Sequence, residues 1–127
     1  MNLKSIYSAL CSAFAAVVVA GTVGGCFSER VAGAAPADAT ELCGGGAPNT
    51  VLIRNFSFGG ELRVRAGTRV VFANCDAMTH SATSDTDVWD SGLIAPNTTF
   101  ERVFDQPGRF PFHCEPHPSM TGAIVVE

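Results

Sequence analysis

The sequence has almost no lysine. Lys4 is the only lysine among 127 residues, and 12 acidic residues outnumber 8 basic ones, so the formal net charge is -4. A protein that binds nucleic acid needs clustered basic side chains to neutralise phosphates. The composition therefore excludes a nucleic-acid partner. A length of 127 residues is enough for one domain plus a leader, and a composition with 46% hydrophobic and 16% charged residues is ordinary for a globular protein.

Charged residues are also missing between Ser5 and Ser28. Lys4 precedes an apolar run, which is the layout of a secretory signal. The run ends in Gly25-Cys26 and resembles a bacterial lipobox, in which the cysteine is lipidated and becomes the mature N-terminus. We therefore expect residues 1–25 to be a lipoprotein-type signal peptide that is cleaved before Cys26. Cleavage after Ala34 and an uncleaved anchor remain open, because about 20 apolar residues can span a bilayer.

All three alternatives place the domain outside the cytoplasm. With Cys26 lipidated, the protein is anchored to a bacterial membrane and faces the periplasm or the cell exterior. The residues that follow are small and show no periodicity, so we expect residues 26–40 to form a flexible tether. The folded domain is expected to cover residues 41–127.

No segment of that domain shows sustained helical periodicity, which favours an all-β fold. Short runs of β-forming residues are bounded by turn residues such as Gly67 and Pro107-Gly108. Many short strands without repeats are typical of a sandwich or barrel. The expected strands are 50–56, 61–65, 69–74, 99–104, 109–114 and 122–126.

The C-terminal strand run leads into a compact set of possible metal ligands. Cys114, His117 and Met120 are each separated by two residues, and His80 lies upstream. One thiolate, two imidazoles and one thioether form a soft N/S ligand set that suits copper. The alternation of a strand points Cys114 inward and His113 outward, so His113 is expected to be an exposed non-ligand.

These residues and their surroundings resemble the cupredoxins, the type 1 blue-copper proteins. The short C-x2-H-x2-M loop is most similar to that of amicyanin and its plastocyanin-like relatives, and the resemblance covers about residues 50–127. The further motifs that carry it are residues 70–74 before Met78-Thr79-His80, Asp90-Ser91-Gly92-Leu93 with Phe100 after it, Pro107-Gly108, and the ending 121–127.

The resemblance implies a Greek-key β-sandwich or barrel of about seven to eight strands. It implies one copper ion per chain, with His80, Cys114 and His117 in a trigonal plane and Met120 as the long axial ligand. The implied function is one-electron transfer by a monomer, with donor and acceptor redox proteins docking near His117. In these relatives a proline and an asparagine usually flank the first histidine, whereas this chain has Thr79 and Ser81.

The small number of histidines argues against an enzyme. Multicopper oxidases and copper nitrite reductases share this fold type but need additional histidine-rich copper centres. The chain has three histidines, of which His80 and His117 are assigned to one site, so His113 alone remains. A copper delivery or storage protein stays open as the alternative function.

Two cysteines remain once Cys11 is assigned to the leader, Cys26 to lipid and Cys114 to copper. In an exported protein the pair Cys43 and Cys75 is expected to form a disulfide. Two separate buried thiols, or Cys75 as an adventitious metal ligand, are the alternatives.

Overall fold

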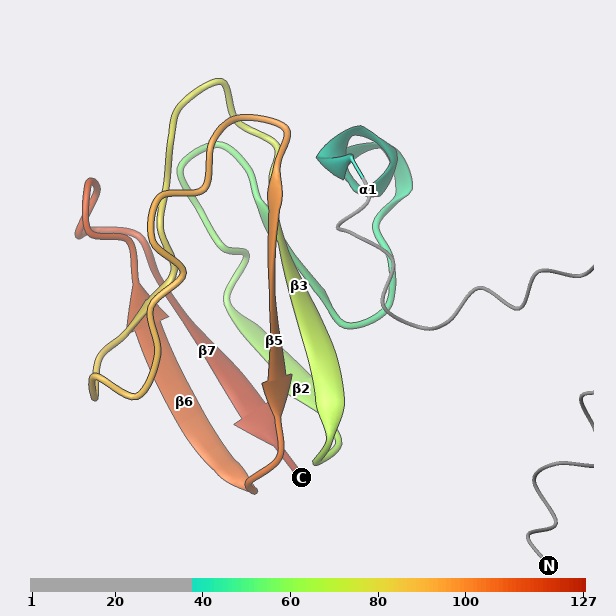
Figure 1. The fold of residues 1–127 in the computed structure, drawn as a ribbon, viewed down its shortest axis with the longest axis vertical. Coiled ribbons are helices and arrows are strands. Elements are labelled where there is room, and N and C mark those ends of the chain that lie inside the picture. The colour runs from blue at the N-terminus through green and yellow to red at the C-terminus, as the bar shows by residue number, and fades with distance from the viewer. Residues whose placement is uncertain (1–37) are drawn as a thin grey trace, which may run out of the picture. The chain divides into compact units, whose positions relative to one another are not determined.

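The structure is a computed structural model and describes residues 38–127 (Figure 1). The expected signal peptide, Cys26 and most of the expected tether lie outside the described residues. The end of that tether was placed wrongly, because Asp38 caps α1 and Ala39 is buried, so the fold begins before residue 41. Within the described residues, the chain forms a helix and seven strands. These are α1 (Ala39–Gly45), β1 (Thr50–Ile53), β2 (Glu61–Val64), β3 (Thr68–Asn74), β4 (Thr83–Ser84), β5 (Thr99–Phe104), β6 (Gly108–His113) and β7 (Thr121–Val126). Over this part of the chain, no helix combines the length and apolar character needed to cross a membrane.

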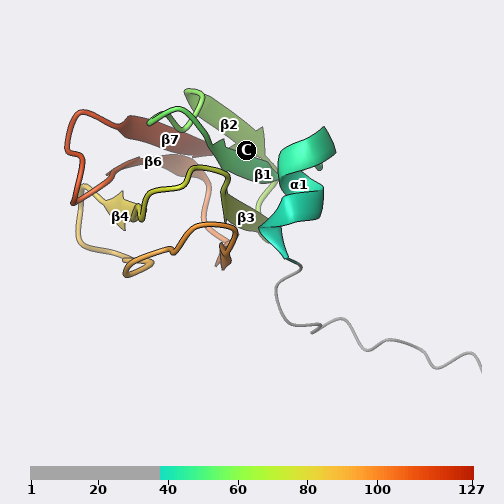
Figure 2. The same cartoon turned by 90° about the horizontal axis from the view of Figure 1, so that it is seen from above.

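The strands form two sheets that pack face to face (Figures 1 and 2). One sheet has the order β1-β3-β5 and the other the order β2-β7-β6-β4. The β1–β3 and β2–β7 pairs are parallel, and the remaining neighbours are antiparallel. The core lies between the sheets, where the fully buried rings of Phe72 and Phe112 meet at 5.4 Å. The predicted β-sandwich is confirmed.

The first expected strand, 50–56, is too long, because β1 ends at Ile53. Arg54 and Ser57 bond to each other across a tight turn, and the two residues between them have positive φ angles, 53° at Asn55 and 55° at Phe56. This left-handed conformation cannot continue a strand. The turn directs the chain from the first sheet to the second.

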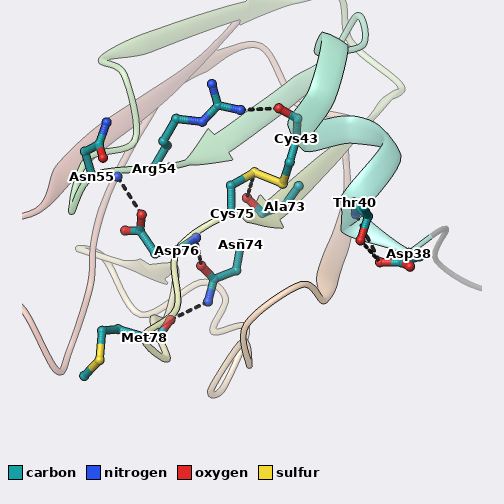
Figure 3. Close-up of a disulfide and its surroundings, with 10 residues drawn as sticks. All are labelled: Asp38, Thr40, Cys43, Arg54, Asn55, Ala73, Asn74, Cys75, Asp76 and Met78. Carbon is teal, nitrogen blue, oxygen red and sulfur yellow. Dashed lines mark hydrogen bonds between the residues drawn. A yellow bond between two sulfur atoms is a disulfide. The ribbon is translucent and has the colours of Figure 1, made fainter.

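Helix α1 was not expected from the sequence. Its seven residues are too few for a helix that is stable by propensity alone. Asp38 caps it by accepting the Thr40 N–H at 3.1 Å. Cys43 then forms a disulfide with Cys75, the residue that follows β3, over a Cα–Cα distance of 5.6 Å (Figure 3). Tertiary contacts of this kind, rather than local periodicity, hold the helix in place.

Gly122 in β7 lies opposite Phe112 in β6, and we expect its replacement by alanine to destabilise the fold. A Cβ atom at this position would lie 2.6 Å from the end of the Phe112 ring. That ring cannot move cheaply, because it is fully buried against Phe58 and Phe72. Overpacking of this kind costs about 1 to 3 kcal/mol. Urea unfolding of Gly122→Ala measures the loss.

The matched control is Gly44→Ala in α1, where an added Cβ meets no atom within 4 Å. Alanine in a helix is favoured over glycine by roughly 0.5 to 1 kcal/mol, so this variant should be as stable as the parent or slightly more stable. Equal stability of the two variants would contradict the close packing of Phe112 on β7.

Candidate metal centre

Three side chains of ligand type converge at one end of the sandwich. The Nδ1 atoms of His80 and His117 each lie 3.7 Å from Cys114 Sγ, and the possible ligand atoms of the three residues all lie within 4.8 Å of one another. His80 and Cys114 have no exposed surface, and His117 is partly exposed. A buried thiol facing two imidazole nitrogens is an arrangement that can hold one metal ion.

His80 is positioned by the segment that follows β3. Its main chain exchanges two hydrogen bonds with Ile94, of 3.1 and 2.7 Å. The buried Asn74 side chain donates to the Met78 carbonyl at 2.7 Å and accepts the Asp76 N–H at 3.0 Å (Figure 3). It also donates to the Ile94 carbonyl at 2.9 Å. The loop that carries His80 is therefore fixed at several points by the end of the strand.

Cys114 directly follows β6, and the loop to β7 carries the other two expected ligands. The alternation of β6 buries Phe112 and Cys114, as the sequence predicts. The Cys114 N–H donates to the Met120 carbonyl at 3.1 Å, and the Met120 N–H donates to the His117 carbonyl at 2.9 Å. Met120 is 3% exposed and belongs to the core cluster that contains Cys114. These bonds close the loop on itself.

Ser81 connects the two ligand-bearing segments. Its N–H points at Cys114 Sγ at 3.3 Å, and its hydroxyl accepts the Glu115 N–H at 2.9 Å. The same hydroxyl lies 3.2 Å from that of Thr83. In the cupredoxins that the sequence resembles, this position is usually an asparagine. Ser81 still joins the two ligand-bearing segments by hydrogen bonds, although it is not an asparagine.

Asp76 also belongs to this site, although the sequence analysis did not single it out. Burial raises the pKa of its carboxyl, but the N–H groups of Phe56 and Asn55 and the His80 ring together hold that pKa below its ordinary value. Asp76 is therefore a carboxylate at neutral pH. The sequence hints at the contact between Asp76 and His80 only through their spacing of four residues. The turn at Asn55 and Phe56, which Asp76 also binds, is distant in the chain.

The third histidine, His113, lies outside the converging group. Its Nδ1 is 2.6 Å from Asp85 Oδ1, and its side chain is 33% exposed. Among the other expected site residues, Cys43 and Cys75 form the disulfide described above. Cys26 lies outside the described residues.

The converging donor set fits copper. A cysteine thiolate and two imidazoles, with a methionine in the same loop, are ligands that suit an ion alternating between Cu(II) and Cu(I). The apolar core around Cys114 and the hydrogen bond from Ser81 hold the thiol in a buried and fixed position. Fold and site together define a copper-binding β-sandwich.

Residues 54–127 match the family described as copper binding proteins of the plastocyanin/azurin family, and the chain belongs to this family. It is 33% identical over 73 residues to amicyanin-alpha of Methylorubrum extorquens, a match that covers 53% of this chain and 60% of that protein. It is also 33% identical over 72 residues to amicyanin of Paracoccus denitrificans, covering 53% and 55%. The matches thus span little more than half the length of these relatives.

Solved structures show the same likeness. A Cu(I) structure of an amicyanin variant has a TM-score of 0.62 and 28% identity, and covers 72% of this chain and 91% of that one. A structure of an oxidised amicyanin variant has the same TM-score at 27% identity, with the same coverage. The identification as a cupredoxin is confirmed, and the His-Cys-His site and the family together indicate one copper ion.

Proposed function

We propose that the protein is a type 1 copper electron carrier and not an enzyme. In this proposal His80, Cys114 and His117 would hold the copper ion as its principal ligands, and Met120 would be the fourth and weaker ligand. The observation that carries it is the buried Cys114 thiol with an imidazole nitrogen 3.7 Å away on each of two segments. When bound, the copper ion supplies one-electron chemistry by alternating between Cu(II) and Cu(I).

The protein's contribution is to hold the ligands still. Cu(II) and Cu(I) favour different geometries, so a rigid intermediate arrangement reduces the atomic movement that accompanies each transfer. The Ser81 bonds and the Asn74 bonds to the His80 segment supply this rigidity. The internal bonds of the Cys114–Met120 loop add to it.

We further propose that donor and acceptor redox proteins dock near His117, which is the partly exposed member of the ligand group. The nearby Phe56 ring, centred 5.0 Å from that of His117, is 50% exposed. An exposed apolar surface beside a ligand suits brief contact, because transient redox complexes bury little area. The carrier is proposed to act as a monomer.

The location of the protein is proposed from the sequence alone. Residues 1–25 are a signal peptide, Cys26 carries the lipid, the tether ends where Asp38 caps α1, and the cupredoxin domain runs from there to residue 127. On this proposal the protein works at a membrane surface outside the cytoplasm. Mass spectrometry of the protein from a bacterial host, read for a lipidated N-terminal Cys26, tests this arrangement.

The function is tested with a soluble fragment that begins at about residue 29. We expect it to bind one Cu(II), to turn intensely blue through thiolate-to-copper charge transfer, and to exchange electrons with a periplasmic redox protein within the time of a stopped-flow experiment. A colourless copper complex would contradict the electron-carrier function. Transfer of the metal itself to an acceptor protein, with slow electron exchange, would point to copper delivery.

A further inference from the structure

The Asp76 carboxylate binds the side of His80 that faces away from Cys114. Asp76 Oδ2 lies 3.0 Å from His80 Nε2, whereas His80 Nδ1 faces Cys114 Sγ. The His80 side chain has no exposed surface, and only 12% of the Asp76 side chain is exposed. Because a carboxylate only accepts hydrogen bonds, it keeps the ring proton on Nε2 and leaves the Nδ1 lone pair free for a metal.

The same carboxylate holds the turn that follows β1. Asp76 Oδ1 accepts the Asn55 N–H at 2.7 Å, and Oδ2 accepts the Phe56 N–H at 2.9 Å; Figure 3 shows the first of these bonds. The left-handed conformation of Phe56 is unfavourable, since its Cβ atom crowds the following carbonyl oxygen. Hydrogen bonds to a charged acceptor are strong enough to hold this turn in place.

This turn places the Phe56 ring against both imidazoles. The ring packs edge-on against His80 at 5.3 Å and against His117 at 5.0 Å between ring centres. Such edge-to-face contacts are favourable and directional. One carboxylate therefore orients His80 directly and, through Phe56, places an aromatic ring against the second histidine.

We propose that Asp76 is a positioning residue that lowers the reduction potential of the copper site. A carboxylate that accepts the outer N–H of a ligating imidazole makes that imidazole more basic and fixes its orientation. A stronger donor with a negative charge behind it stabilises Cu(II) more than Cu(I). This inference rests on the proposed electron-carrier function and adds to it a residue that sets the potential.

The test is Asp76→Asn in the copper-loaded protein. Asparagine retains the shape and one oxygen acceptor but removes the charge. We expect the affinity for Cu(II) to fall about ten- to a hundredfold, as is typical when a hydrogen-bond partner of a metal ligand is lost. The affinity for Cu(I) falls less, so a redox titration should show a more positive potential while the blue colour persists.

The matched control is Asp85→Asn. It removes the same charge from a carboxylate that bonds a histidine, His113, outside the ligand group. A larger positive shift for Asp76→Asn than for Asp85→Asn supports the proposal, and equal shifts overturn it. If the parent chain does not bind copper in a blue form, the electron-carrier function itself fails, whereas a blue Asp76→Asn protein with an unchanged potential contradicts only the role of Asp76.

A measurement on the unaltered protein covers the case in which Asp76→Asn does not fold. In the diamagnetic Cu(I) form, nitrogen-15 NMR distinguishes the two His80 tautomers. A proton on Nε2 that is protected from exchange and strongly deshielded supports the charged hydrogen bond. A proton that exchanges freely with water, or an Nδ1 tautomer, overturns it.

Discussion

Cys114→Ser is expected to remove essentially all of the intense visible absorption of the copper-loaded protein. The colour arises from electron donation by the thiolate to copper, and a serine hydroxyl is a harder and far less polarisable donor. No nearby group can replace the thiol, because Cys114 is the only free cysteine in residues 38–127. The Ser81 N–H that points at Cys114 Sγ would face a hydroxyl oxygen in place of the sulfur.

Absorption spectra after addition of one equivalent of Cu(II) measure this effect. The matched control is His113→Gln. It alters the residue next to Cys114 in the sequence, but the histidine that it replaces bonds Asp85 and lies outside the ligand group. That variant should remain blue. Retained colour in Cys114→Ser would show that the thiolate is not the source of the absorption and would remove the basis of the proposed ligand set.

Loss of the disulfide is expected to produce the largest change in stability. Cys43→Ala combined with Cys75→Ala opens a loop with a sequence separation of 32. In the chain-entropy treatment, the bond restricts the unfolded chain and contributes roughly 3 to 4 kcal/mol. Since small domains are stable by only about 5 to 15 kcal/mol in total, this is a large fraction of the whole. Urea unfolding of the metal-free protein measures the change.

The same loss should appear when the unaltered protein is unfolded in the presence of a reductant. Cys114→Ser, which leaves the disulfide in place, should lose the same amount of stability in reductant, whereas the Cys43→Ala/Cys75→Ala variant should be insensitive to reductant. A thiol count on the denatured protein without reductant gives an independent check, since a bonded pair reacts only after reduction. Two reactive thiols at Cys43 and Cys75 without reductant would mean that the bond is absent.

The fold class could be predicted from the sequence because its signals are local. Strand 99–104 was expected with the observed bounds, and β2, β3, β6 and β7 differ from expectation by one residue at one or both ends, because alternation and turn residues act over short stretches. The first strand was expected three residues too long, and the two-residue β4 was not expected. The grouping of ligands within one short loop is equally local. His80 is brought to that loop by β3, whose end was also predicted at Asn74.

The features that could not be predicted depend on contacts between distant segments. Helix α1 is too short to give a sustained helical pattern, and it is held by its disulfide to the residue that follows β3. The contact of Asp76 with Asn55 and Phe56 requires a left-handed turn, and neither residue is a glycine that would have indicated one. The hydrogen bond between Ser81 and Glu115 could not be predicted either. A serine hydroxyl has many possible partners, and only the folded chain brings Glu115 close to this one.

The parallel pairing of β2 with β7 has a consequence for the order of folding. Val64 at the end of β2 lies beside Val126 at the end of β7, so pairing in the second sheet joins segments that are far apart in the sequence. Domains dominated by such distant pairings fold on a scale of roughly milliseconds to seconds. The Cys114–Met120 loop lies between β6 and β7, so its final shape forms together with this last pairing. We therefore expect the complete set of copper ligands to come together only when β6 and β7 are paired.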